Sequence, residues 1–156
     1  LEDLAIVPLL AVLALLTPST GVGGDAGSRW VSVGRLDINT TGLLLLTDDG
    51  ALIHRLTSPR HHVPKVYEVG CRHALDESQV ARLRDGVVLD DDPAPVRAVA
   101  CVQTGTHQLA LSLTEGRYHQ VRRMFASQGA EVLTLHRARF GTTPTPSGSG
   151  SHSLSR

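Results

Sequence analysis

The sequence predicts an α+β fold in which a mostly antiparallel mixed sheet is flanked by a few helices. Segments with the pattern of strands outnumber segments with the pattern of helices, and the two kinds do not alternate regularly along the chain. The chain has 156 residues, of which 41% are hydrophobic, and this is enough for one domain to bury a core. The formal net charge of zero favours no class of partner by itself.

The first 30 residues are expected to form an atypical apolar segment and a linker. The run Ala11–Leu16 predicts a helix packed against the sheet. Residues 1–16 begin with acidic side chains, where a signal peptide carries basic ones, and Pro8 interrupts an apolar run that is short for a bilayer. Residues 17–28 are rich in Gly, Ser and Thr and predict a loop.

Asp37 is the first candidate for chemistry. It follows a short apolar strand at residues 31–33, and a Thr-Thr-Gly turn separates it from the unbroken apolar run at residues 43–46. A carboxylate presented by a loop between two buried elements suits a nucleophile or a general base. The alternative is a structural cap, in which the carboxylate binds the amides around Asn39 and Thr40.

Local signals place the remaining helices and strands. A helix at residues 76–86 is marked by Asp76 as N-cap, by Gln79 three residues later and by Gly86 at its end. A short helix at residues 51–57 is ended by the Ser-Pro pair that follows it. The other expected elements are a helix at residues 118–128 and strands at residues 65–69, 87–89, 96–102, 108–113 and 131–140.

Two long motifs connect these elements with a known family. The string VGRLDINTTGLLLLTDDGALIHRLTSPRHHVPKVYEV resembles the catalytic motif region of RNA pseudouridine synthases, and EGRYHQVRRMFASQG resembles their second active-site motif. Within the first string, TSPRHHVPK is similar to the RsuA branch, whose members isomerise a uridine of bacterial small-subunit ribosomal RNA. The resemblance covers residues 31–141 and implies the α+β catalytic domain of that family.

The resemblance implies three catalytic residues, which are Asp37, Tyr67 and Arg122. Asp37 matches the essential carboxylate, and Tyr67 matches the tyrosine whose ring stacks on the target base. Arg122 matches the active-site arginine, and we expect it beside Asp37, where a guanidinium would keep the carboxylate ionised and oriented. The implied reaction cuts a uracil from its ribose, turns it and rejoins it through carbon, so we expect an isomerase without a cofactor. Covalent attack by Asp37 and removal of a ribose proton both remain open.

Positive charge is concentrated in the two motif regions. Fixed charges sum to +3 over residues 54–73 and again over residues 110–140, but to −4 over residues 76–92. This distribution fits a phosphate backbone as the partner, although solvated faces would give the same pattern. The residues expected to bind RNA are Arg35, Arg60, His61, His62, Lys65, Arg117, His119 and Arg123.

No metal site is expected from the cysteines, histidines or acidic residues. Cys71 and Cys101 have no CxxC partner, and the adjacent His61 and His62 would point to opposite sides of an extended segment. The acidic run at residues 90–92 precedes a proline and predicts an exposed turn. We expect a monomer of the bacterial cytoplasm that binds small-subunit ribosomal RNA, free or in assembling particles, and that contacts no membrane.

Both ends of the chain depart from the family pattern. Members normally show a strand with an Asn-Lys-Pro-like turn near the start, often after a small RNA-binding domain, and neither is visible in residues 1–30. We therefore expect a fragment or an altered amino terminus, an incomplete sheet, a catalytic core at residues 31–141 and a disordered tail at residues 142–156. Two other functions remain open, namely a catalytically impaired RNA-binding remnant and an unrelated hydrolase that uses Asp37 with His119.

Overall fold

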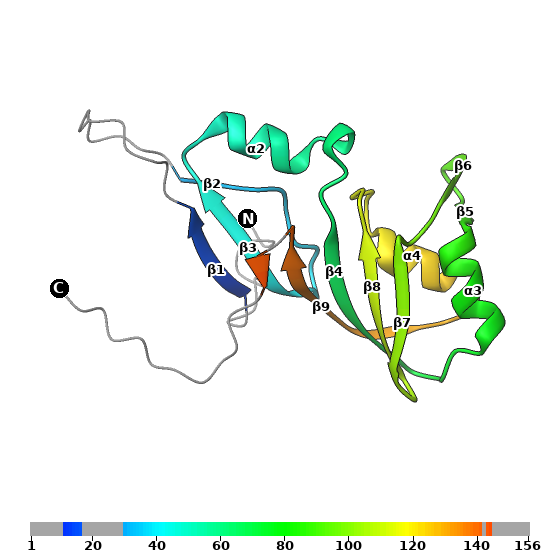
Figure 1. Ribbon diagram of the computed structural model, residues 1–156. Helices are drawn as coiled ribbons and strands as arrows, with labels where there is room; N and C mark the ends of the chain where they lie inside the picture. The colour runs from blue at the N-terminus through cyan, green and yellow to red at the C-terminus, as the bar shows by residue number, and fades with distance from the viewer. Residues whose placement is uncertain (1–10, 17–29, 142, 145–156) are drawn as a thin grey trace, which may run out of the picture.

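The computed structural model describes residues 11–16, 30–141 and 143–144. Over these residues it shows a mixed sheet with helices packed beside it, which confirms the α+β class (Figure 1). The helical elements are α2 (Gly50–Thr57), α3 (Glu77–Asp85), α4 (Gln120–Ala126) and the 3-10 turn η1 (Pro59–His61). The strands are β1 (Ala11–Leu16), β2 (Val31–Ser32), β3 (Thr41–Thr47), β4 (Lys65–Cys71), β5 (Val87–Leu89), β6 (Asp92–Val96), β7 (Ala100–Gly105), β8 (Gln108–Leu113), β9 (Val132–Phe140) and β10 (Thr143–Pro144).

The main sheet has the strand order β1-β3-β9-β4-β8-β7, with β2 pairing on β3 and β10 pairing on β9. Strands β1 and β9 run parallel to β3, whereas β4 is antiparallel to both β9 and β8, and β7 is antiparallel to β8. Strands β5 and β6 form a separate hairpin. The register places Tyr67 of β4 between Leu111 of β8 and Arg137 of β9, which brings segments far apart in the sequence to one point.

Two apolar clusters make up the core. The larger one packs helices α3 and α4 against the antiparallel half of the sheet and includes the fully buried Leu83 and Phe125. The smaller one includes Leu43 and Phe140, with partly buried side chains of α2 packed on it. Tyr67 packs against the larger cluster and Phe140 belongs to the smaller one. The neighbouring strands β4 and β9 therefore bring the two clusters together.

The helix signals in the sequence are confirmed with small changes at the ends. In α3 the Asp76 carboxylate accepts the Gln79 N–H at 2.8 Å, and the Gln79 side chain accepts the Asp76 N–H at 2.9 Å, which is the predicted capping box. Helix α4 begins at Gln120, two residues later than predicted, because His119 has a φ of 47° in the left-handed region.

The prediction of a helix at Ala11–Leu16 is wrong, since these residues form strand β1. Their backbone pairs in parallel with β3 over six consecutive positions, from Ala11 opposite Gly42 to Leu16 opposite Thr47. A short apolar run has no period that separates a helix from a strand of a parallel sheet. Pairing with β3, which lies elsewhere in the sequence, makes this segment a strand.

Two further boundaries differ from the prediction. The single strand expected at residues 96–102 is split, because Val96 ends β6 and Ala100 begins β7. Between them the Ala98 N–H donates to the Leu83 carbonyl at 2.7 Å, which ties this segment to helix α3. Strand β10 lies within the tail that was expected to be disordered, and it pairs with the end of β9. The rest of that tail, and residues 1–10 and 17–29 of the expected amino-terminal segment, lie outside the described residues.

Candidate active site

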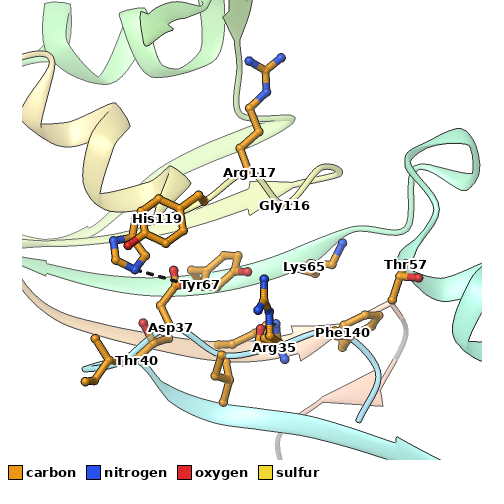
Figure 2. A pocket seen from close by; sticks show the side chains of 15 residues that line it. Arg35, Asp37, Thr40, Thr57, Lys65, Tyr67, Gly116, Arg117, His119 and Phe140 are labelled. Carbon is orange, nitrogen blue, oxygen red and sulfur yellow. Dashed lines mark hydrogen bonds and ion pairs between the residues drawn. The ribbon is translucent and has the colours of Figure 1, made fainter. Parts of the chain in front are cut away.

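A cavity of about 540 Å³ lies where the two core clusters meet (Figure 2). Its walls come from five segments, which are the loop at residues 34–40, the end of α2, strand β4, the loop at residues 116–119 and strand β9. These segments belong to the two motif regions and to the strand that follows the second motif. The fold therefore gathers around one space the stretches that the sequence singled out.

Asp37 projects into this cavity from the loop between β2 and β3. The Thr40 N–H donates to the backbone carbonyl of Asp37 at 3.0 Å, and Asn39 has a φ of 64°, so the chain turns sharply after Asp37. The Asp37 carboxylate itself does not cap the amides of Asn39 and Thr40 within the described residues. Its Oδ1 lies 3.9 Å from Nε2 of His119, and 38% of its side chain is exposed. The backbone makes the turn, which leaves the carboxylate for chemistry.

Tyr67 enters the cavity from β4, on the face of the sheet that carries Lys65 (Figure 2). The pairing of β4 with β9 shifts between Val66 and Tyr67, so that Arg137 lies opposite the tyrosine. Burial raises the pKa of the Tyr67 hydroxyl, and a hydrogen bond and the positive charge of Arg137 partly offset this effect. The phenol is therefore held neutral with its hydroxyl fixed.

Arg137 is the buried arginine of the site, with only 3% of the residue exposed. Its Nε donates to the Leu43 carbonyl at 2.9 Å and its Nη1 donates to the Arg35 carbonyl at 3.3 Å. Its guanidinium also lies 5.1 Å from the centre of the Phe140 ring. A guanidinium has five donors, and burying it is tolerable only where such acceptors surround it. Arg137 thus connects β3, the Asp37 loop and Tyr67.

Arg137 was not singled out from the sequence, although a signal for it exists. Leu135 and Arg137 are two residues apart on β9, so they share a face of the strand, and Leu135 is buried. A step of two residues from the inward Leu135 predicts that Arg137 points into the protein, although the same step fails for Leu133, which is 50% exposed. An inward arginine next to a catalytic motif is a candidate site residue, because its guanidinium needs several fixed hydrogen-bond acceptors.

Arg122 does not stand beside the Asp37 carboxylate as expected. Its guanidinium donates to the carbonyls of Asn39 at 2.9 Å and of Val132 at 3.0 Å, and it is not among the residues that line the cavity. Arg122 therefore reaches from α4 to the turn that follows Asp37. The side chain that the structure places near the carboxylate is that of His119, whose ring stacks on Tyr118.

The loop at residues 115–119 is held by its own polar contacts. The buried Gln120 accepts the Arg117 N–H at 2.8 Å and donates to Glu115 at 3.3 Å. Arg117 also pairs with Glu115 at 3.3 Å and with Asp92 of the β5–β6 hairpin at 2.9 Å. This network fixes the loop at residues 115–119, and that loop places His119 close to Asp37.

The residues predicted to bind RNA fall into three groups. Arg35, Lys65, Arg117 and His119 line the cavity. Arg60, His61 and His62 are exposed at η1, and none of them lines it. Arg123 pairs with Asp90 at 2.7 Å and with Asp91. The acidic run is thus the turn that was predicted, but its carboxylates bind two arginines that were assigned to phosphates.

Lys65 has an unusual setting for an ammonium group. It is half-buried, its Nζ donates to the Val63 carbonyl at 3.4 Å, and it lies 5.2 Å from the centre of the Phe140 ring. Burial lowers the pKa of Lys65, and the positive charge of Arg137 lowers it further. Lys65 therefore contributes a cation to the cavity wall, and partial loss of its hydration makes the charged form less favourable than in water.

The described residues also carry information on membrane spans and on metal sites. No helix in this part of the chain is long and apolar enough to cross a membrane. No group of three or more histidine, cysteine, aspartate or glutamate side chains comes together there as a metal site.

Comparison with known proteins identifies the family. Residues 17–127 match the model of the RNA pseudouridylate synthase family, so the chain belongs to it. Within that family it belongs to the RsuA branch that the motifs indicated. It is 46% identical over 110 residues to ribosomal small subunit pseudouridine synthase A of Yersinia pestis, and 48% identical over 111 residues to the protein of that name from Escherichia coli K12.

These matches cover part of each protein. They include 70% of this chain, and 47% and 48% of the two relatives, so the chain spans about half the length of the curated relatives it matches. A crystal structure of a pseudouridylate synthase has 41% identity and a TM-score of 0.72, covering 74% of this chain and 50% of that one. Family and fold are thereby shown together.

Proposed function

We propose that this chain isomerises a uridine to pseudouridine in bacterial small-subunit ribosomal RNA. The observation that supports this proposal most directly is the cavity into which both the Asp37 carboxylate and the Tyr67 ring project. The names of the relatives support the substrate, and the family supports the reaction. Family membership also speaks against the unrelated hydrolase, although Asp37 and His119 do lie close together.

The reaction requires the target nucleotide to leave its stack. A base inside folded RNA cannot reach a recessed carboxylate, so the uridine must be flipped into the cavity. The ring of Tyr67 then replaces the stacking that the base has lost. The N1–C1′ bond breaks, the uracil turns and C5 bonds to C1′, while C5 loses a proton and N1 gains one. Nothing is oxidised or reduced, so we propose that no cofactor takes part.

Asp37 is the essential carboxylate in this proposal. It either attacks the nucleotide covalently or removes a ribose proton, and both routes need an ionised group in a fixed position. Arg122 and Arg137 act as positioning residues, since Arg122 binds the Asn39 carbonyl and Arg137 binds the Arg35 carbonyl on either side of Asp37. The positive charges on the cavity wall attract the RNA backbone.

We place the catalytic core at residues 31–141, acting as a monomer in the cytoplasm on RNA that is free or in assembling particles. Arg60, His61 and His62 extend the RNA contact beyond the cavity in this proposal. Their exposure at the turn after α2 is the supporting observation.

The test is pseudouridine formation in protein-free small-subunit RNA and in partly assembled subunits. The parent chain is compared with Asp37→Asn, which is nearly isosteric but uncharged, and with Asp85→Asn, which makes the same change at an exposed position on α3. We expect product from the parent and from Asp85→Asn and none from Asp37→Asn, with RNA binding kept within a few-fold. Absence of product from a parent that melts cooperatively and binds RNA would instead support the impaired remnant.

A further inference from the structure

Lys65 is the only lysine among the 156 residues, whereas the chain has many arginines. It precedes Tyr67 by two positions on β4, and both side chains line the cavity (Figure 2). Two residues along a strand span about 6.6 Å. This separation is comparable with that between the base and the backbone phosphate of one nucleotide. A base on Tyr67 would therefore bring a phosphate of its own nucleotide within reach of Lys65.

The charges around the cavity leave a place for an anion. Asp37 is the one carboxylate among the lining residues, against the four cations Arg35, Lys65, Arg117 and Arg137. Arg117 is already paired with Glu115 and Asp92, but neither Lys65 nor Arg35 forms an ion pair within the described residues.

The Lys65 ammonium group has hydrogen-bond donors that are available to such an anion. Its ammonium has three donors, and one of them meets the Val63 carbonyl. A half-buried cation near a second cation is unfavourable unless negative charge joins them. The lowered pKa of Lys65 reflects this cost.

We propose that Lys65, together with Arg35 on the facing loop, binds the backbone phosphate of the flipped uridine and so sets the depth at which the nucleotide enters. This inference rests on the proposed function, and it names the part of the RNA that this end of the cavity recognises. Tyr67 and Asp37 hold the base and the ribose, and the phosphate lies toward Phe140 and Thr57. The site is specific for the phosphate of an inserted nucleotide rather than for RNA charge in general.

The single lysine permits a direct test on the intact chain. Biosynthetic incorporation of ¹³C-labelled lysine labels Lys65 alone and leaves its ammonium group unchanged, with all three donors. We expect the Lys65 signal to titrate below the ordinary lysine value of 10.5, and its pKa to rise when uridine 3′,5′-bisphosphate is added. Unmodified uridine should leave the pKa unchanged. No rise with the bisphosphate, or an equal rise with inorganic phosphate at the same concentration, would overturn the proposal.

A kinetic test uses the uridine located in the activity assay. RNA that carries an uncharged methylphosphonate at the adjoining linkage is compared with natural RNA. We expect Lys65→Gln to lower kcat/KM about tenfold or more on natural RNA and to change little on the uncharged RNA. Lys65→Arg should recover part of the loss, and Arg82→Gln on the exposed face of α3 should act like the parent on both.

The outcomes separate this proposal from the proposed function. An active parent and an equally active Lys65→Gln would overturn the phosphate site while leaving the isomerase in place. An equal loss for Lys65→Gln on both RNAs would show that Lys65 serves the fold or another part of the reaction. An inactive parent would contradict the proposed function, and the NMR titration would still decide whether Lys65 binds the nucleotide phosphate.

Discussion

Tyr67 offers a way to measure the environment of the cavity without any substrate. The chain has two tyrosines, so the variant Tyr118→Phe leaves Tyr67 as the sole source of tyrosinate absorbance. We expect Tyr67 to ionise above the ordinary value of 10.0, because burial penalises the phenolate. Arg137→Met should raise the pKa further, since the guanidinium favours the phenolate. A Tyr67 that titrates at or below 10.0 would mean that burial does not outweigh the guanidinium of Arg137.

The same shift has a consequence for stability. Because the pKa of Tyr67 is higher in the folded chain, the unfolded chain loses this proton first as the pH rises above about 10. The contribution of Tyr67 to stability is therefore present below that value and is lost as the pH rises through the folded pKa. Denaturation of Tyr118→Phe between pH 9 and 11 should show a decline that is smaller in Tyr67→Phe,Tyr118→Phe.

Arg122 distinguishes two ways in which an arginine can serve Asp37. If its charge alone matters, Arg122→Lys should keep most of the activity. If it holds the turn through the carbonyls of Asn39 and Val132, lysine cannot reproduce the two directed bonds. We expect the second result, a fall in kcat of about 100-fold with a nearly unchanged affinity for RNA, as small misplacements of reacting groups produce. Full activity of Arg122→Lys would restore the interpretation as a charge.

At the scale of elements, the contact between β3 and β9 is unusually close at Gly42. This residue has a φ of 114°, and a side-chain carbon there would collide with the backbone of Arg137. We expect Gly42→Ala to lower the free energy of unfolding by about 1–3 kcal/mol or more, since β3 must move away from β9. Gly50→Ala is the matched control, because that site has open space around it. Chemical denaturation of both variants measures the difference, and equal stability would contradict the close contact.

Helix α3 and strand β1 differ in how much of their structure is determined by local sequence. Helix α3 was predicted because the signals for its start and its end lie within the segment itself, from the N-cap Asp76 to the C-cap Gly86. Strand β1 was not, because its identity depends on pairing with β3 rather than on its own pattern. Asp37 and Tyr67 were predicted through motifs, and the cavity does contain both.

The contacts between site residues could not be predicted in the same way. Whether Arg122 or Arg137 approaches the site depends on how β9 pairs with β4 and on how the first turn of α4 lies against the Asn39 turn. Both are matters of long-range register. A motif indicates which residues matter, but it does not determine which carbonyl a guanidinium reaches.

At the scale of the whole molecule, the segments of opposite charge bind one another. The acidic turn of the β5–β6 hairpin pairs Asp90 and Asp91 with Arg123, and Asp92 with Arg117. These contacts hold α4 and the loop at residues 115–119 against the hairpin. Arg117 and Arg123 of the second motif are therefore paired within the fold, whereas Arg35 and Lys65 of the first motif line the cavity without an ion pair among the described residues.

This division predicts an unequal response of RNA binding to salt. Each phosphate contact adds about 0.7–0.9 to the slope of log K against log salt concentration. Arg35→Gln should lower that slope by about this amount, because Arg35 has no ion pair within the described part of the chain. Arg123→Gln removes the same charge from a side chain already paired with Asp90 and Asp91, so its slope should stay near that of the parent. Equal reductions would show that RNA displaces the acidic turn, and Asp91→Asn should then tighten binding rather than leave it unchanged.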